Sequence, residues 1–596
     1  MLLDTHISMP SQDPLAENKF SLLPRDLRKW IKNLPYVDQD LALQQFYDGL
    51  KRSNRQAHAT KQRLAAIEIM CPVAHDFLIS QRKYLLSQTF PLSKKATEVL
   101  KLQQNILNEL AVAYKIIIQE TVNRDSRLNN KKLVTCVHHA MHYQLEQYIT
   151  LAQVYSEPPQ SFWQDLCQMY GIAEHFELTG LLIKNEIDPS LPKSSPKSLF
   201  IHACLLSLSN LHTYGHGEAG KIANHLNKLG HLVHLSDDLP KKSECTFYIN
   251  LALREPVRLM HTNEISISSK NRYIDATALV KELKETENSQ NSDEQESNYS
   301  PQVITKSLSK RLLKKLTSKP NRASKRAVPA KGRLHLVIGM HNVIEILQTG
   351  HTVIEKVSKS DIDKANLELM PIQNSKTSTF YNDNHNDDEP GYMVSSSDAW
   401  DWISRGNVVS EQSKNVVAET TPKQTDNIDK VNLNPVVQTW DISNASKGGY
   451  CLSSCNTSDY QSQVGDIVLI RLEDKQHDDW RLGVIRWMQS LSSQGVKMGI
   501  ETVKGTVDVM EVIEAQQTSE RSAEVEYILQ TTEKTPNGCN KTIITPPNAA
   551  ANGDCFVLSK DNSRQAVSCQ QLLEKTIAFA QFSYTEMPAL PNGEHN

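Results

Sequence analysis

The stretch Asn444-x-Ser446-x-x-Gly449 combines three residue types that can together bind a polar, planar ligand. The Asn444 amide offers one acceptor and two donors, which suits the edge of a nucleobase, and Ser446 adds a short hydroxyl. Gly449 and its neighbour Gly448 let the backbone approach a ligand closely. The competing interpretation is an ordinary Asx or Ser turn between the strand-like runs "VVQTWDI" and "YCL". The six residues alone favour the turn.

A second pattern, Arg322-x-x-x-Arg326, stands just before the strand-like run Leu334–Ile338. The planar guanidinium fork fits phosphate oxygens, or the O6 and N7 acceptors of guanine, and each good bidentate guanine contact supplies about 1–3 kcal/mol. The alternative is a solvated basic linker. The surrounding basic segment 306–333 lacks interleaved aromatic residues for base stacking, so we expect no specific nucleic-acid partner.

Together, these two patterns and the strands after them resemble the PilZ domain, a small β-barrel receptor for cyclic di-GMP. The resemblance extends over "VGDIVLIRL", "WRLGVIRW" and "GVKMGIETV", which are similar to the later barrel strands of that family. It implies that Arg322 and Arg326 clamp guanine and phosphate from a flexible arm. It also implies that Asn444 reads guanine, Ser446 contacts the ligand, and Gly449 allows close approach.

Two features depart from the family pattern. Arg326 and Asn444 are 118 positions apart (444 − 326), whereas the family joins its motifs by a short stretch. A long surface insertion costs little closure free energy, so the barrel can still close. Asn444 also replaces the commoner Asp and offers no charged acceptor. The whole layout resembles long gammaproteobacterial PilZ proteins with a helical N-terminal region, some of which act in type IV pilus function and surface attachment.

The periodicity predicts a multidomain α+β chain: an all-helical N-terminal region, then a PilZ-like antiparallel β-barrel with a long disordered insertion, then additional C-terminal strands. The predicted boundaries are a helical domain at 1–235, a short mixed segment at 236–284, and a disordered acidic-then-basic linker at 285–320. The barrel follows at 321–515, with its insertion at about 341–435, and a C-terminal β unit at 516–596.

The bulk composition limits the class of protein. The chain has 596 residues, too many for one core, and its net charge of −3 is not that of a basic nucleic-acid binder. The start lacks a basic n-region and an apolar h-region, and no apolar run approaches the roughly 18 residues of a membrane span. The ten cysteines have no framework spacing, which indicates reduced thiols in a cytoplasmic protein.

Three other motifs have simpler explanations. "GHGEAGKI", Gly215–Ile222, imitates a P-loop, but Ile222 stands where Ser or Thr is needed, and the preceding run reads as helix. His138 and His142 are four apart on one helix face, yet they lack the Glu of H-E-x-x-H. Cys451 and Cys455 are read as small strand or loop residues. We therefore expect no metal, no cofactor and no catalytic residues.

The leading hypothesis is a receptor that couples cyclic di-GMP binding to an unknown protein partner, with type IV pilus, motility or surface-attachment machinery as candidates. The alternative is a degenerate PilZ-like scaffold that acts only through protein–protein contacts. A P-loop NTPase that uses Lys221 is a third hypothesis, which the missing hydroxyl residue argues against.

Overall fold

The computed structural model describes 18 segments of the chain. They are residues 7–13, 20–86, 90–123, 128–184, 193–238, 246–260, 268–288, 306–317, 332–349, 353–354, 436–446, 448–454, 461–473, 479–491, 495–516, 525–536, 538–561 and 563–587. The chain divides into two compact units, Met1–Gly350 with Thr439–Asn596, and His351–Gln438. Everything below concerns the first unit, except the short strand pair noted with the first barrel.

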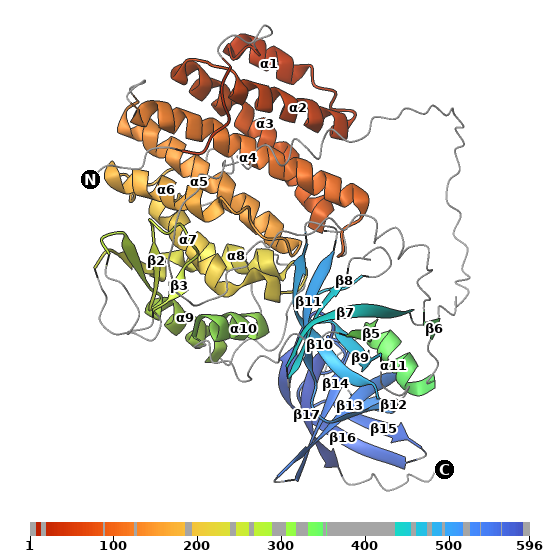
Figure 1. The fold of residues 1–596 in the computed structure, drawn as a ribbon. Helices are drawn as coiled ribbons and strands as arrows, with labels where there is room; N and C mark the ends of the chain where they lie inside the picture. Colours follow the sequence, from red (N-terminus) through yellow and green to blue (C-terminus); the bar gives the residue numbers. More distant parts are fainter. Residues whose placement is uncertain are drawn as a thin grey trace, which may run out of the picture. The chain divides into compact units, whose positions relative to one another are not determined.

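The N-terminal third is helical, as its apolar periodicity predicts (Figure 1). Its helices are α1 (Pro24–Lys32), α2 (Gln39–Arg55), α3 (Thr60–Leu86), α4 (Lys94–Val122), α5 (Asn130–Gln153), α6 (Phe162–His175), α7 (Pro196–Ser209) and α8 (Glu218–Leu229), with 3-10 turns η1 (Leu211–Thr213) and η2 (Gly230–Leu232). Side chains cap several N-termini; Ser93, the N-cap of α4, accepts a hydrogen bond from the Ala96 amide at 3.2 Å.

One helical stretch among the described residues, Thr60–Arg82 in α3, is long and apolar enough to cross a membrane by length and composition. Buried residues of this stretch, among them Leu64, Ile67, Met70 and Phe77, belong to the core that the N-terminal helices share. A core helix passes the same test, so this stretch is weak evidence for a span.

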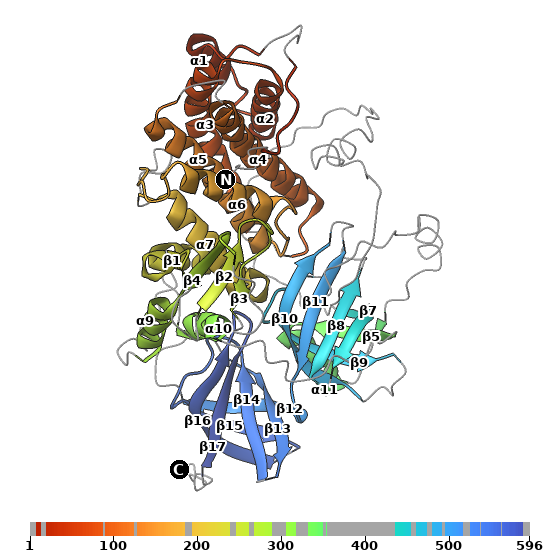
Figure 2. The same cartoon turned by 60° about the vertical axis from the view of Figure 1, so that its left-hand side comes forward.

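A small antiparallel sheet follows, in the order β1-β4-β2-β3. Its strands are β1 (His234–Ser236), β2 (Thr246–Asn250), β3 (Arg258–Leu259) and β4 (Asn271–Asp275), and the helices α9 (Thr277–Asn288) and α10 (Lys306–Thr317) come after it (Figure 2). The predicted disordered linker 285–320 is therefore wrong at residues 285–288, which end α9, and at residues 306–317, which form α10. Its residues 289–305 and 318–320 lie outside the described residues.

The first barrel comprises β5 (Arg333–Ile338), β7 (Val436–Ser446), β8 (Gly449–Ser454), β9 (Ile467–Leu472), β10 (Arg481–Ser490) and β11 (Val496–Thr502). The strands run in the order β5-β9-β10-β11-β8-β7, and a β5–β7 pairing closes the ring. Helix α11 (Met340–Thr349) follows β5, and the short β6 (Val353–Ile354) pairs with the start of β7. Alternate residues such as Leu336, Trp440 and Ile470 fill the interior.

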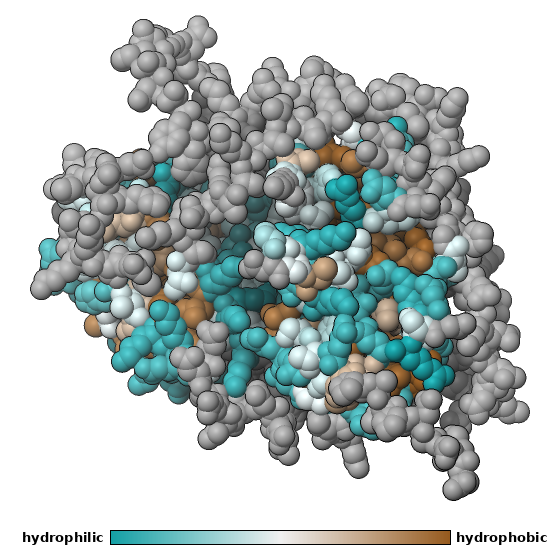
Figure 3. All heavy atoms as spheres, turned by 90° about the horizontal axis from the view of Figure 1, so that it is seen from below, coloured by the Kyte–Doolittle hydropathy of each residue, from teal (hydrophilic) through white to brown (hydrophobic). Residues whose placement is uncertain are grey.

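The second barrel is closed too, in the order β12-β13-β14-β17-β16-β15. Its strands are β12 (Thr506–Gln516), β13 (Tyr527–Thr535), β14 (Gly538–Thr545), β15 (Cys555–Lys560), β16 (Ser563–Lys575) and β17 (Ala580–Met587). The predicted boundary at 515/516 differs from this arrangement, because β12, expected in the first barrel, belongs to the second. Seen from below, small apolar patches on the described surface are separated by hydrophilic residues (Figure 3).

The multidomain α+β class, with a helical N-terminal region, an antiparallel β-barrel and additional C-terminal strands, is as predicted. The predicted disordered insertion at about 341–435 is wrong at its start, because residues 341–349 belong to α11. Most of the insertion, residues 355–435, lies outside the described residues.

Candidate functional site

The β7–β8 hairpin carries the three motif residues in the first barrel. Its buried Trp440 and Leu452 point into the barrel core. The register between the strands shifts between Ile442 and Asn444, so Ser443 forms a bulge. A bulge re-aims the residues after it, and Asn444 lies exposed opposite Cys451.

Ser446 and Gly449 close this hairpin. They face each other in the register, and the Ser446 hydroxyl donates to the Gly449 carbonyl at 3.4 Å. A Cβ on Gly449 would lie 2.0 Å from the Ile500 carbonyl oxygen of β11. The sheet itself therefore requires this glycine, whether or not a ligand also approaches it.

Asn444 begins a row of residues that crosses four strands. The row continues through Cys451 on β8 and Gly499 on β11 to Trp487 on β10. Cys451 and Gly499 alternate with core residues on either side, so the row lies on the outer face of the barrel. A Cβ at Gly499 would lie 1.9 Å from Trp487 Nε1, so the indole covers the glycine. Sequence reasoning missed Trp487, because only the pairing of β10 with β11 brings the indole over Gly499.

The neighbouring outer row contains a cation. Lys497 on β11 pairs with Ser453 of β8 and Gln489 of β10. Burial raises the pKa of the Cys451 thiol, while Lys497 and a hydrogen bond with Ser443 act to lower it. Lys497 is thus close enough to act electrostatically on the Asn444 row, and it is a second residue that the motif search missed.

Arg322 and Arg326 lie outside the described residues, but the residue that follows their segment is placed. The Gly332 carbonyl accepts a hydrogen bond from the Ile442 amide at 2.9 Å, two residues before Asn444. Arg326 is six positions from Gly332 (332 − 326), a reach of about 20 Å for extended chain.

The long insertion leaves from the other end of this strand pair. His335 lies 3.4 Å from Thr439, measured from Nδ1 to Oγ1, and Gly332 meets Ile442. Residue numbers therefore rise on β5 as they fall on β7, which makes the pair antiparallel. The β5–β7 pair therefore places Gly332 beside Ile442, although Arg326 and Asn444 are 118 positions apart in the sequence.

A cavity of about 250 Å³ lies beside Trp487. It is lined by Glu157, Asn210 and His212 and by Trp487, Met488 and Gln489 of β10. Burial lowers the pKa of His212, and the nearby Glu157 acts to raise it. The cavity continues the outer-face row with aromatic and polar groups.

Two of the three other sequence motifs have structural roles, and Cys455 of the third lies outside the described residues. In the P-loop look-alike, α8 begins at Glu218, whose carboxylate accepts from the Gly215 amide at 2.7 Å, and the turn η1 precedes it where a P-loop has a strand. His138 bonds to Ser194 at 2.7 Å, and burial lowers its pKa well below the usual value. Within the described residues, no group of three His, Cys, Asp or Glu side chains could hold a metal ion.

Comparisons with known proteins match most of the chain. Residues 25–241 match the family described as "Cyclic-di-GMP receptor FimW, N-terminal domain", and residues 246–506 match "Cyclic-di-GMP receptor FimW, middle PilZ domain". The cyclic-di-GMP receptor FimW of Pseudomonas aeruginosa is 22% identical over 504 residues, which cover 84% of this chain and 80% of the relative. No solved structure shows a significant match.

Proposed function

Because the chain belongs to the FimW-like PilZ-domain proteins, we propose that it is a receptor that couples cyclic di-GMP binding to a protein partner. The observation that carries the proposal is the meeting of β5 and β7. It brings the end of the arginine segment, at Gly332, within a hydrogen bond of Ile442 and so beside Asn444.

The hairpin supplies base recognition in this proposal. The exposed Asn444 amide faces solvent on the outer surface, where it can pair with a guanine edge. Ser446 offers its hydroxyl oxygen as an acceptor while its proton bonds to Gly449. Gly499 and Asn444 are two strand spacings apart, about 10 Å, so the Trp487 indole can stack on another part of the same dinucleotide.

The arm supplies the charge. Arg322 and Arg326 reach the ligand from the Gly332 side and bind phosphate and guanine bidentately. Lys497 adds a positive charge from the barrel. Ligand would thereby order the arm against the hairpin, which is a recognised form of molecular switch.

The proposal also covers the class of protein, its partners and its compartment. FimW, the relative, is named as a receptor, so we assign this chain to binding and not to catalysis. Candidate partners are type IV pilus, motility or surface-attachment machinery, in the cytoplasm. Eight cysteines among the described residues are free, in keeping with a reducing compartment.

Titration calorimetry of the full chain with cyclic di-GMP tests the proposal. Arg322→Ala and Arg326→Ala are each expected to weaken binding about tenfold or more, because each removes a bidentate contact. Lys325→Ala is the matched control, since it removes one positive charge from the same segment, and it should change the affinity less than about twofold.

Two further variants locate the ligand on the barrel. Asn444→Ala should weaken binding, and Trp487→Phe should retain binding while removing the ligand-induced change in tryptophan fluorescence. No heat of binding by the wild-type chain would favour the alternative of a scaffold that acts only through protein contacts. Equal losses of affinity in the Lys325 and arginine variants would show that the arm contributes only nonspecific positive charge.

A further inference from the structure

The two barrels have the same strand connectivity. Numbered in chain order with β6 set aside, the first barrel has strands β5, β7, β8, β9, β10 and β11, and the second has β12 to β17. In both, strand one pairs with two and four, strand three with two and six, and strand five with four and six. The matched PilZ family stops at residue 506, where β12 begins, so it leaves the second barrel unassigned.

The hairpins between strands two and three agree residue by residue. In the second barrel Thr535 faces Gly538, as Ser446 faces Gly449 in the first. The Thr535 hydroxyl donates to the Gly538 carbonyl at 2.8 Å, the counterpart of the bond in the first barrel. Glu533, opposite Asn540, occupies the place of Asn444, since both are five positions before the glycine.

The second barrel differs in what precedes its first strand. Strand β11 ends at residue 502 and β12 begins at 506, which leaves residues 503–505 and no room for an arginine arm. Lys504 in this link lies 3.5 Å from Glu533, between Nζ and Oε1. The acidic group of the hairpin is thus already paired with a cation of its own chain.

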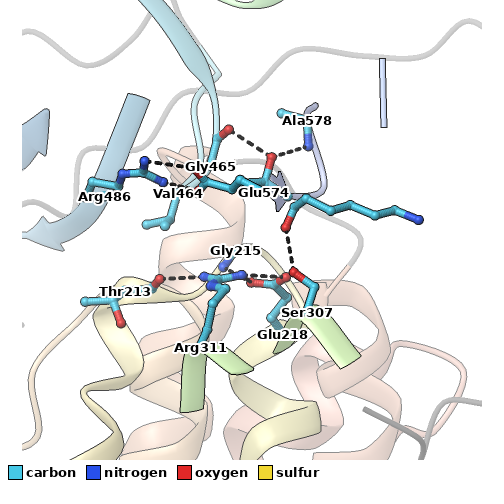
Figure 4. A network of polar contacts seen from close by, with 12 residues as sticks. Thr213, Gly215, Glu218, Ser307, Arg311, Val464, Gly465, Arg486, Glu574 and Ala578 are labelled. Atoms are coloured by element: carbon cyan, nitrogen blue, oxygen red, sulfur yellow. Dashed lines mark hydrogen bonds and ion pairs between the residues drawn. The ribbon is translucent and has the colours of Figure 1, made fainter. Parts of the chain in front are cut away.

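The hairpin between strands five and six makes contacts outside the second barrel (Figure 4). Thr576 donates its hydroxyl to the Gly465 carbonyl of the first barrel at 3.1 Å. Glu574 binds the guanidinium of Arg486, also in the first barrel, with one contact at 3.0 Å. The Lys575 carbonyl accepts from Ser307 of α10 at 2.9 Å. Thr576 is itself buried, so this tip is a packed contact.

We propose that residues 506–587 are a second copy of the first barrel and that this copy docks on the rest of its own chain. Its docking surface is the Glu574–Phe579 tip, which contacts Gly465 and Arg486 of the first barrel and Ser307 at the start of α10. The Glu533–Gly538 hairpin keeps the shape of the motif but takes no dinucleotide. Only this last clause rests on the proposed function.

Hydrogen exchange of the full chain tests the docking. The double variant Glu574→Ala, Thr576→Val should raise amide exchange about tenfold or more at Gly465–Asp466 and in α10. The control Glu514→Ala, which removes an exposed carboxylate of β12, should leave both segments unchanged. Unchanged protection of Ile528 and Ile543 in the double variant shows that the second barrel is still folded. Unaltered exchange at both segments, with that core intact, would overturn the docking.

Calorimetry tests whether the hairpin of the second barrel that carries Glu533 and Thr535 binds cyclic di-GMP. Glu533→Ala with Thr535→Ala should leave the stoichiometry and affinity for cyclic di-GMP unchanged, whereas loss of a binding equivalent would overturn it. If the wild-type chain binds no cyclic di-GMP, the proposed function fails, and the exchange experiment still decides the docking.

Discussion

Single residues of the hairpin show how far a motif can be interpreted from sequence. Asn444 and Ser446 could be predicted as a polar pair because their types and spacing are local. The requirement for Gly449 could not, since it comes from the Ile500 carbonyl of a strand about fifty positions away. Trp487 was missed for the same reason, because a row across four strands is invisible in linear order.

The glycine requirement gives a matched pair of variants. In Gly449→Ala, the new Cβ meets backbone at 2.0 Å, so we expect the free energy of unfolding to fall by about 2 kcal/mol or more. In Gly448→Ala, the Cβ meets no atom within 4 Å, and the change should be under about 1 kcal/mol. Urea denaturation followed by tryptophan fluorescence measures both; equal losses would show that the close approach is absent.

Asp466 predicts a pH dependence of stability. Burial raises its pKa to about 6, and the hydrogen bond from the Gln463 amide offsets this in part. Because the unfolded carboxyl titrates near pH 4, the stability present below that pH is lost as the pH rises from about 4 to about 6. Asp466→Asn should therefore raise the free energy of unfolding by about 2 kcal/mol at pH 7 and little at pH 4.

Thermal melts of the wild type and of Asp466→Asn between pH 4 and pH 7 check whether the stability gain appears only as the pH rises. The matched control is Asp479→Asn, which alters a more exposed carboxyl group near the same barrel. A benefit from Asp466→Asn that is as large at pH 4 as at pH 7 would contradict the buried-carboxyl explanation.

Among the elements, α10 shows why the linker prediction failed. Its sequence "KSLSKRLLKKLT" is so basic that it was read as a solvated segment. The four leucines Leu308, Leu312, Leu313 and Leu316 nevertheless form one face and are buried in the helical core. By contrast, the strands of the first barrel could be predicted, because short β-branched runs bounded by glycine and polar residues are a local signal.

One ion pair fixes α10 at its middle. The Arg311 guanidinium bonds to Glu218 at 2.8 Å and to the Thr213 carbonyl at 2.8 Å (Figure 4). It also lies over the ring of Tyr214. Arg311→Ala should lower the free energy of unfolding by about 1–3 kcal/mol, since it leaves a largely buried Glu218 without its partner. Lys310→Ala, next to it and exposed, is the control and should have little effect.

Chemical denaturation combined with hydrogen exchange measures this effect. Loss of protection confined to α10 and α8 would show a local role for the ion pair, and equal loss in both variants would contradict it.

At the scale of the whole molecule, the insertion separates residues that are far apart in sequence but close in space. Its ends are close, because Val353 pairs with Val436. Replacing residues 355–435 by a short Gly-Ser linker should therefore leave the affinity for cyclic di-GMP within about twofold. Removing residues 327–330, a much smaller deletion, should abolish high affinity because it shortens the link between Gly332 and Arg326. Calorimetry measures the affinity of both variants for cyclic di-GMP. A large loss of affinity in the first deletion would indicate that the insertion contacts the ligand.

The broad architecture followed from sequence, while the boundary between the barrels did not. Strand β12 continues the pattern of β11 with only residues 503–505 between them, so nothing local marks a change of domain. Only the pairing of β12 with β13 and β15 shows where the second barrel begins.

The shared connectivity also bears on how the chain reaches its native state. Because the two barrels share one connectivity, a strand of one barrel can pair at the equivalent position in the other while the chain folds. Neighbouring domains of the same fold are prone to this kind of misassembly. The paired hairpins nevertheless differ in sequence: "GYCLSS" in β8 stands against "GCNKTIIT" in β14. A polar lysine inside a foreign core would be costly, so this divergence between the copies guards against strand exchange during synthesis.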